Sequence, residues 1–316
     1  MATRPALDVK LGRQILTWGT GDAVFINDVF PKDYVSFFSG RSDDYLKAPS
    51  DAVRIGFFSQ AVNLDLVVMA ADDVDRTADG TRLRLGSPAT GLAAAPDRHL
   101  ASELPKGAEV ALRAHRTVGA FELAGYAYQG HWKITAGTDP VSGRGIYPEL
   151  SVYGASLRGP VAGGIFSAEV GYYDSRQDSD GANPAVANSE LRVLAGFERE
   201  IAPDTTLGVQ YYAARMADYD AYVEAAQPGA ALQDQTRDLV TARLTKRLLN
   251  QNLTASALVF YSPTQEDHYL RLGLSYKPSD ALTLGATLGH FGGARDTPFG
   301  QLGNAGSVGL SLRYGF

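Results

Sequence analysis

The chain has 316 residues, 45% of them hydrophobic and 20% charged, with a formal net charge of -6. This composition excludes a disordered chain, and the lack of any block rich in Lys and Arg predicts no nucleic-acid partner. Cysteine is absent, which excludes a disulfide framework and thiolate catalysis. No run of about 18 apolar residues occurs, so a transmembrane helix is excluded.

Strict two-residue alternation of apolar and polar residues recurs along the chain. In the final segment, for example, Val308, Leu310 and Leu312 alternate with small or polar residues. A helix would repeat its apolar positions about every 3.6 residues, so this period predicts strands. In chain order, the predicted strands cover residues 6–18, 52–60, 62–71, 108–118, 120–132, 149–159, 164–175, 189–200, 205–216, 237–249, 252–262, 268–277, 281–291 and 307–316.

The links between these strands alternate in length. Short links carry turn residues, as at 202–204 and 278–280, whereas long links such as 19–51 and 72–107 separate them. Outer-membrane barrels have short periplasmic turns and long extracellular loops, whereas sandwiches show no such parity. The sequence therefore predicts one domain over residues 1–316, an all-β transmembrane antiparallel up-and-down β-barrel of fourteen strands in the bacterial outer membrane.

One stretch near the start carries a motif. The pattern G-R-Q-x3-W-G, then N-D and P-x-D, runs from Gly12 to Asp33. It resembles the signature of porin-like outer-membrane proteins related to the alginate-export barrels and to a neighbouring family of unknown function. The resemblance covers about a tenth of the chain and implies a porin-like barrel. In such proteins this strand follows at least one earlier strand, and here no signal peptide precedes it, so we expect either a fourteen-stranded barrel or a trimmed chain of a sixteen-stranded one.

The long link over residues 19–51 is unusually apolar between residues 23 and 38, where four phenylalanines occur. Side chains of this kind must be buried, so we expect the loop to fold into the lumen as a constriction. Packing on the outer rim or on another protomer is the alternative. The residues predicted to form or pin the constriction are Arg13, Trp18, Asp22, Asn27, Asp28 and Asp33.

A charge that faces lipid costs about 2–4 kcal/mol at the midplane, so the alternation assigns most wall charges to the lumen. The residues predicted to line the pore are Arg54, Arg113, His115, Glu169, Arg192, Arg243, Arg247, Arg271 and Arg313. Their positive excess predicts a channel for small polar or anionic solutes. Alternatively, these charges pair with inward acids and only stiffen the barrel.

Motifs for other chemistry are missing. The sequence contains no P-loop, G-x-S-x-G or H-E-x-x-H motif, so we expect no cofactor, no metal and no enzyme. Acidic clusters at 72–79 and 174–180 lack the spacing of an EF-hand and are interpreted as solvated loops. An outer-membrane hydrolase that uses His131 or His268 near the rim, and a structural barrel that scaffolds a partner, are the alternatives to a channel.

The expected partners are membrane components. Outer-membrane lipid and lipopolysaccharide would surround the apolar outer face of a barrel. The last strand ends at Phe316, and such an aromatic end resembles the strand that the barrel-assembly machinery recognises.

Overall fold

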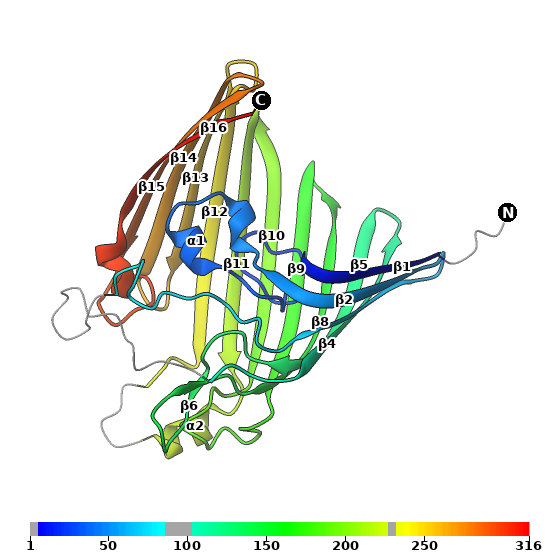
Figure 1. Cartoon of the computed structure of the whole chain (residues 1–316), viewed down its shortest axis with the longest axis vertical. Coiled ribbons are helices and arrows are strands. Elements are labelled where there is room, and N and C mark those ends of the chain that lie inside the picture. The colour runs from blue at the N-terminus through cyan, green and yellow to red at the C-terminus, as the bar shows by residue number, and fades with distance from the viewer. Residues whose placement is uncertain (1–5, 86–102, 227–231, 316) are drawn as a thin grey trace.

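A computed structural model describes residues 6–85, 103–226 and 232–315. Within these residues, fourteen strands form one antiparallel sheet in which each strand pairs with the next wall strand along the chain (Figure 1). The strands are β1 (Ala6–Ile15), β2 (Pro49–Phe58), β3 (Asn63–Ala70), β4 (Ala108–Val118), β5 (Phe121–His131), β8 (Glu149–Val161), β9 (Gly164–Ser175), β10 (Glu190–Ala202), β11 (Thr205–Met216), β12 (Thr236–Leu248), β13 (Leu253–Ser262), β14 (Asp267–Ser279), β15 (Leu282–Gly292) and β16 (Ser307–Tyr314).

The predicted all-β, antiparallel, up-and-down class is confirmed, and β4 and β9 begin and end at the predicted residues. The first strand is shorter than predicted. It ends at Ile15, because Leu16 and Trp18 leave the sheet and are buried inside it. The connection from β1 to β2 therefore covers residues 16–48, and we call it the inward segment.

The long connections contain short elements that the sequence did not predict. They are helix α1 (Tyr34–Phe38), the 3-10 turn η1 (Asp43–Leu46), hairpin strands β6 (Gly137–Thr138) and β7 (Gly145–Ile146), helix α2 (Tyr219–Ala225) and the 3-10 turn η3 (Gly300–Ala305). Each is too short for a hydrophobic period to show. Among the described residues, every helix falls short of the length and hydrophobicity that a membrane-spanning helix needs.

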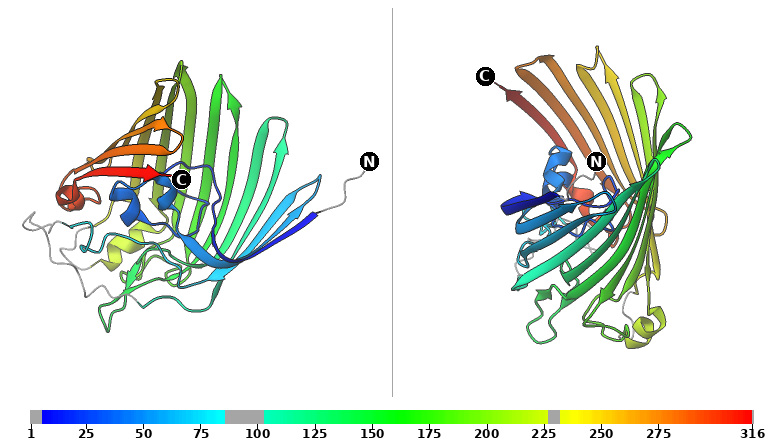
Figure 2. Two further views of the ribbon diagram at one scale, coloured as in Figure 1. Left: turned by 45° about the horizontal axis from the view of Figure 1, so that its top comes forward. Right: turned by 90° about the vertical axis from the view of Figure 1, so that its right-hand side faces the viewer.

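The sheet is rolled, and α1 lies on its concave side (Figure 2). In β14, for example, the outward positions carry the exposed side chains of Leu272 and Leu274. The inward positions on either side of them are Arg271, Gly273 and Ser275. The alternation thus separates an apolar outer face from a polar inner one, as predicted. One feature of the predicted barrel is not seen, because among the described residues no ladder joins β1 to β16. Leu11 and Leu310, on these edge strands, are more than 80% exposed because each strand lacks one neighbour.

The inside of the rolled sheet holds two apolar clusters, and both form between the inward segment and the wall. The first joins Trp18, Ile26 and Phe30 to wall residues such as Tyr126 and Tyr173. The second joins Phe37 and Leu46 to wall residues that include Phe260, Tyr269 and Phe291. The apolar run of the inward segment is therefore buried against the inner face of the wall.

Candidate functional site

A single carboxylate on the wall anchors the first half of the inward segment. Glu169 of β9 points inward and is only 4% exposed. Its two oxygens accept hydrogen bonds from the backbone N–H and hydroxyl of Thr20, the N–H of Gly21, and the N–H and side-chain amide of Asn27. The segment thus wraps its donors around an anion, as backbone nests do. Glu169, predicted to line the pore, lies beneath the segment instead.

Two facing glycines make this close approach possible. Gly154 on β8 lies opposite Gly171 on β9. A Cβ on Gly154 would lie 1.8 Å from Asn27 Oδ1, and one on Gly171 would lie 2.6 Å from Ile26 Cγ2. Any side chain at Gly154 would displace the segment, because glycine alone lets another chain approach this closely.

Two arginines of the wall hold the segment at Asp22, in its first half, and at Arg41 and Asp43, in its second half. Arg243 of β12 contacts Asp22 at 2.6 Å and Asp43 at 2.8 Å. Arg271 of β14 contacts the other oxygen of Asp43 at 2.7 Å and donates to the carbonyl of Arg41 at 2.6 Å. The predicted lining residues Arg243 and Arg271 and the predicted pin Asp22 therefore meet, through an aspartate that the sequence analysis missed.

Two further predicted pins order the segment, and one of them also joins it to the connection after β3. Asp33 caps α1, since its Oδ1 accepts the N–H of Ser36 at 2.8 Å, and it pairs with Arg76 at 2.5 Å. Asp28 forms a buried ion pair with Lys32 at 3.0 Å. The cap and the Asp28–Lys32 pair order the segment locally, whereas the Asp33–Arg76 pair ties it to the connection after β3.

Trp18 and Arg13, at the start of the segment and just before it, have different surroundings. Trp18 packs edge-on against Phe30 with ring centroids 4.9 Å apart, inside the first apolar cluster. Arg13 lies apart from the constriction contacts, because it pairs with Asp51 at 3.1 Å and Asp73 at 3.6 Å in an exposed position.

The remaining predicted lining residues differ in how they are paired. Arg54 pairs with Asp65 at 2.6 Å, and His115 lies 3.7 Å from the same aspartate. Arg113 pairs with Glu122 at 2.7 Å. Part of the predicted lining is thus paired with inward acids on the inner face. The alternative interpretation, in which such pairs stiffen the barrel, describes these residues.

Three other predicted lining residues complete the set. Arg192 pairs with Glu190 at 2.5 Å and stacks over the ring of Tyr173 at 3.7 Å. Arg247 and Arg313 have no side-chain partner among the described residues. These two arginines keep an unneutralised charge.

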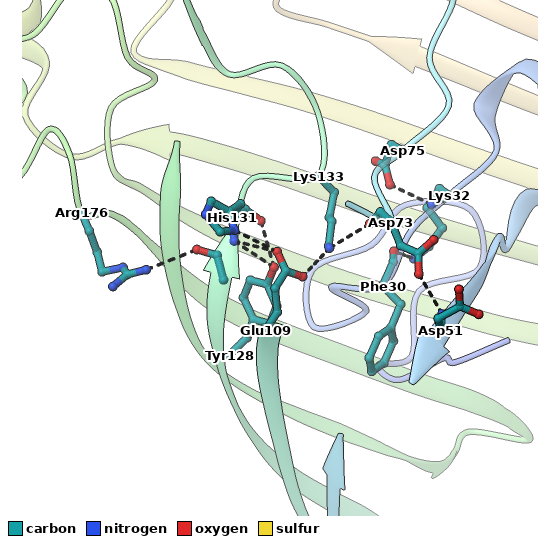
Figure 3. A network of polar contacts seen from close by, with 11 residues as sticks. Phe30, Lys32, Asp51, Asp73, Asp75, Glu109, Tyr128, His131, Lys133 and Arg176 are labelled. Carbon is teal, nitrogen blue, oxygen red and sulfur yellow. Dashed lines mark hydrogen bonds and ion pairs between the residues drawn. The ribbon is translucent and has the colours of Figure 1, made fainter. Parts of the chain in front are cut away.

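A polar network lies at the long-loop ends of β4 and β5 (Figure 3). Glu109 is fully buried, and its carboxylate contacts Lys133 and the backbone N–H and ring of His131. Lys133 also donates to the carbonyl of Asp73 at 2.9 Å. The neighbouring Asp75 accepts the backbone N–H of Lys32 at 2.7 Å. The network therefore ties the connection after β3 to both the wall and the inward segment.

Beside this network, a cavity of about 130 Å³ opens between the inward segment and the wall. Its lining includes Lys32, Asp75, Lys133 and Arg192. Burial raises the pKa of the Asp75 carboxyl to about 6, against the opposing effect of Lys32. Burial likewise raises the pKa of the Tyr34 phenol well above its ordinary value.

Sequence reasoning did not select Asp43, Asp75, Lys133 or Trp132 as site residues. Asp43 and Asp75 lie in long connections, where nothing in a two-residue period marks a contact. Trp132 is the last residue of the predicted strand 120–132 but lies just after the observed end of β5, and Lys133 follows it. Of the cavity residues that were not selected, Lys32 could have been found from the sequence, because it is the middle residue of the P-x-D motif.

The alternative chemistries gain no support from the side chains proposed for them. His131 contacts Glu109, and the ring of His268 lies 5.7 Å from that of His290. Within the described ranges neither His131 nor His268 hydrogen-bonds to a Ser or Thr hydroxyl. In the same part of the chain, no three His, Asp or Glu side chains lie close enough to hold a metal ion.

Several solved structures resemble this arrangement of strands, and those compared are porins. A porin refined at 1.8 Å resolution aligns with a TM-score of 0.47 and 12% identity, covering 99% of this chain and 100% of that one. A triple mutant of the Rhodopseudomonas blastica porin aligns with a TM-score of 0.42 and 11% identity, covering 85% of this chain and 78% of that one. No protein-family profile and no curated protein sequence matches the chain.

Proposed function

We propose that this chain forms a channel in the bacterial outer membrane for small polar or anionic solutes, with the inward segment as its constriction. The observation that carries the proposal is the contrast between the two faces of the wall. The outer face is apolar, and the inner face holds a charged lining and a segment anchored by Glu169, Arg243 and Arg271. A wall of this kind suits lipid outside and polar solutes inside.

The preference for anions rests on inward charges that lack a partner of opposite sign within the described residues. The cations are Lys10, Arg158, Arg247, Lys277 and Arg313, and the acids are Asp8, Glu198, Glu200 and Asp267. Five cations against four acids leave an excess of one positive charge along the inner face of the wall. A cationic lining concentrates anions and lowers their barrier to entry.

The proposal requires that the seam between β1 and β16 is closed in the membrane. In lipid, no water can bond to an unpaired backbone N–H or C=O group, so each such group costs on the order of several kcal/mol. Pairing of β1 with β16 would give the fourteen-stranded form, and insertion of two strands would give the sixteen-stranded form.

Kinship with the alginate-export barrels is proposed on the motif between Gly12 and Asp33 alone. Lipid and lipopolysaccharide are proposed as surroundings of the outer apolar face. Recognition by the barrel-assembly machinery is proposed through the last strand, whose final residue Phe316 lies outside the described residues.

Deleting residues 24–38 tests the proposal. We expect the purified deletion variant to conduct several-fold more current than the unmodified protein in planar bilayers, with weaker selectivity, because the constriction is gone. Removing the hairpin at residues 137–146 is the control, since it shortens another long connection. Equal conductance of the assembled deletion variant and the unmodified protein would refute the constriction. No conductance in any variant would favour the scaffold alternative.

A further inference from the structure

The cavity beside the polar network has the size and lining of a site for a small aromatic molecule. Its volume is about 130 Å³. An engineered apolar cavity of about 150 Å³ in another protein holds benzene, so a single ring fits this space. Six of the fifteen lining residues are aromatic, namely Phe25, Phe30, Tyr34, Tyr128, Trp132 and Tyr173.

The buried side-chain atoms of this lining that have no hydrogen-bond partner among the described residues are both N–H donors. Trp132 is 4% exposed, and its Nε1 has no hydrogen-bond partner among the described residues. The Nε of Arg192 is also buried without a partner there. A buried donor without an acceptor costs about 1–3 kcal/mol. The cavity therefore offers two unused N–H groups to an acceptor that enters it.

The acidic groups of the cavity are already engaged. Asp28 accepts hydrogen bonds from Lys32 and from the hydroxyl of Thr17, at 3.0 and 2.9 Å. Asp75 accepts the backbone N–H of Lys32. A ligand that brings an acceptor thus meets available donors, whereas a ligand that brings an ammonium group competes with Lys32 for these carboxylates.

The charge around Arg192 favours an acceptor that is an anion. Glu190 is shared between Arg192 at 2.5 Å and Arg237 at 3.4 Å, so two guanidinium groups face one carboxylate. The ring of Trp132 lies 5.6 Å from that of Tyr173, and Arg192 stacks over Tyr173. An aromatic surface, unused donors and one excess positive charge therefore meet on one side of the cavity.

We propose that this cavity binds a small aromatic monocarboxylate, with its ring against Trp132 and Tyr173 and its carboxylate accepting from Trp132 Nε1 and Arg192. The inference rests on the proposed function, because it makes the cavity a solute-selecting site beside the constriction. It deepens that function by naming the class of solute.

Titration calorimetry of the detergent-solubilised protein with benzoate tests the site. Trp132→Phe keeps a ring and removes the N–H, and we expect it to weaken benzoate binding about tenfold, the effect of one hydrogen bond to a charged group. Tyr269→Phe is the matched control, since it keeps a ring and also removes a buried polar group without a partner among the described residues, here a hydroxyl outside this cavity. Its affinity for benzoate should equal that of the unmodified protein.

Comparison of probes on the unmodified protein does not depend on any variant folding. Acetate lacks the ring and benzamide lacks the charge, so both should bind at least tenfold more weakly than benzoate. Equal binding of acetate or benzamide and benzoate, no benzoate binding, or an unchanged affinity in an assembled Trp132→Phe variant would each overturn the site. Conductance without benzoate is measured separately. Benzoate binding without conductance would overturn the proposed channel function and leave the proposed binding site standing. Conductance without benzoate binding would overturn the binding site and leave the channel function standing.

Discussion

The wall and the inward segment are stabilised in different ways. In the wall, each strand satisfies the backbone of its neighbours, and the side chains only need to alternate between two environments. In the inward segment, no strand among the described residues pairs with residues 19–27, and side chains of the wall bind the backbone donors instead, as Glu169 does for Gly21 and Asn27. The wall thus depends on local alternation, and the segment depends on a few distant partners, with Arg271 lying 228 residues from Asp43.

The two anchors of the segment also differ from each other. Glu169 is buried and serves five donors, whereas the side chain of Asp43 is 44% exposed and makes two ion pairs. Buried hydrogen bonds to a charge are costly to remove, and exposed ion pairs contribute little because water screens them. We therefore expect the position of the segment to depend mainly on Glu169.

The largest expected effect comes from a change in the wall. Leu272→Arg puts a charge on the outer face at a cost of about 2–4 kcal/mol near the midplane, and we expect it to abolish assembly. Ser275→Arg, on the inner face of the same strand, is the control and should assemble. Heat-dependent migration on gels measures assembly. Equal assembly of the two variants would show that the two faces have been misassigned.

A smaller effect is expected at the buried anchor. Glu169→Ala leaves the donors of Thr20, Gly21 and Asn27 unsatisfied, and we expect the segment to detach at a cost on the order of 3 kcal/mol. Tryptic cleavage at Arg41 should then accelerate by about a hundredfold, since about 1.4 kcal/mol changes an equilibrium tenfold. Glu198→Ala is the control, because Glu198 has no ion pair among the described residues. Similar cleavage in both variants would contradict the role of Glu169 as an anchor.

The exposed anchor should matter less. Asp43→Asn weakens the ion pairs with Arg243 and Arg271, each worth about 0.2–1 kcal/mol when exposed, so tryptic cleavage at Arg41 should rise by less than about tenfold. Asp44→Asn is the matched control, since the one side-chain hydrogen bond that Asp44 makes among the described residues is from the hydroxyl of Ser42. High salt should reduce the difference between Asp43→Asn and the unmodified protein. An effect larger than that of Glu169→Ala would reverse the ranking of the two anchors.

The smallest expected effect is a pH dependence at the junction of segment and network. The pKa of Asp75 is raised from 3.8 to about 6, so its stabilising contribution is greatest below about 4 and is lost as the pH rises through 6. Protonation between pH 7.5 and 5 removes a negative charge near Lys32, Lys133 and Asp28. The anion-to-cation permeability ratio should therefore rise by less than about twofold over this range. Asp75→Asn should abolish the change, and a full pH response in that variant would assign it to another group.

The sequence predicted the wall well because a strand with one face in lipid and one in the lumen must alternate. The run from Phe166 to Tyr172 shows this plainly, and β9 begins and ends where it was expected. The site was predicted less completely. Asn27, Asp28 and Glu169 were predicted as separate site residues, but no sequence pattern pairs Asn27 with Glu169.

The number and order of the strands, and the face of the sheet that each side chain takes, could be predicted from the pattern of residues. Each depends on residues two positions apart or on the next strand. The path of the inward segment could not be predicted in this way. Its apolar run required burial, but where it is buried depends on the hollow at Gly154 and Gly171 and on carboxylates and guanidinium groups that lie far along the chain. Those partners come together only when the sheet rolls, and no local period records that contact.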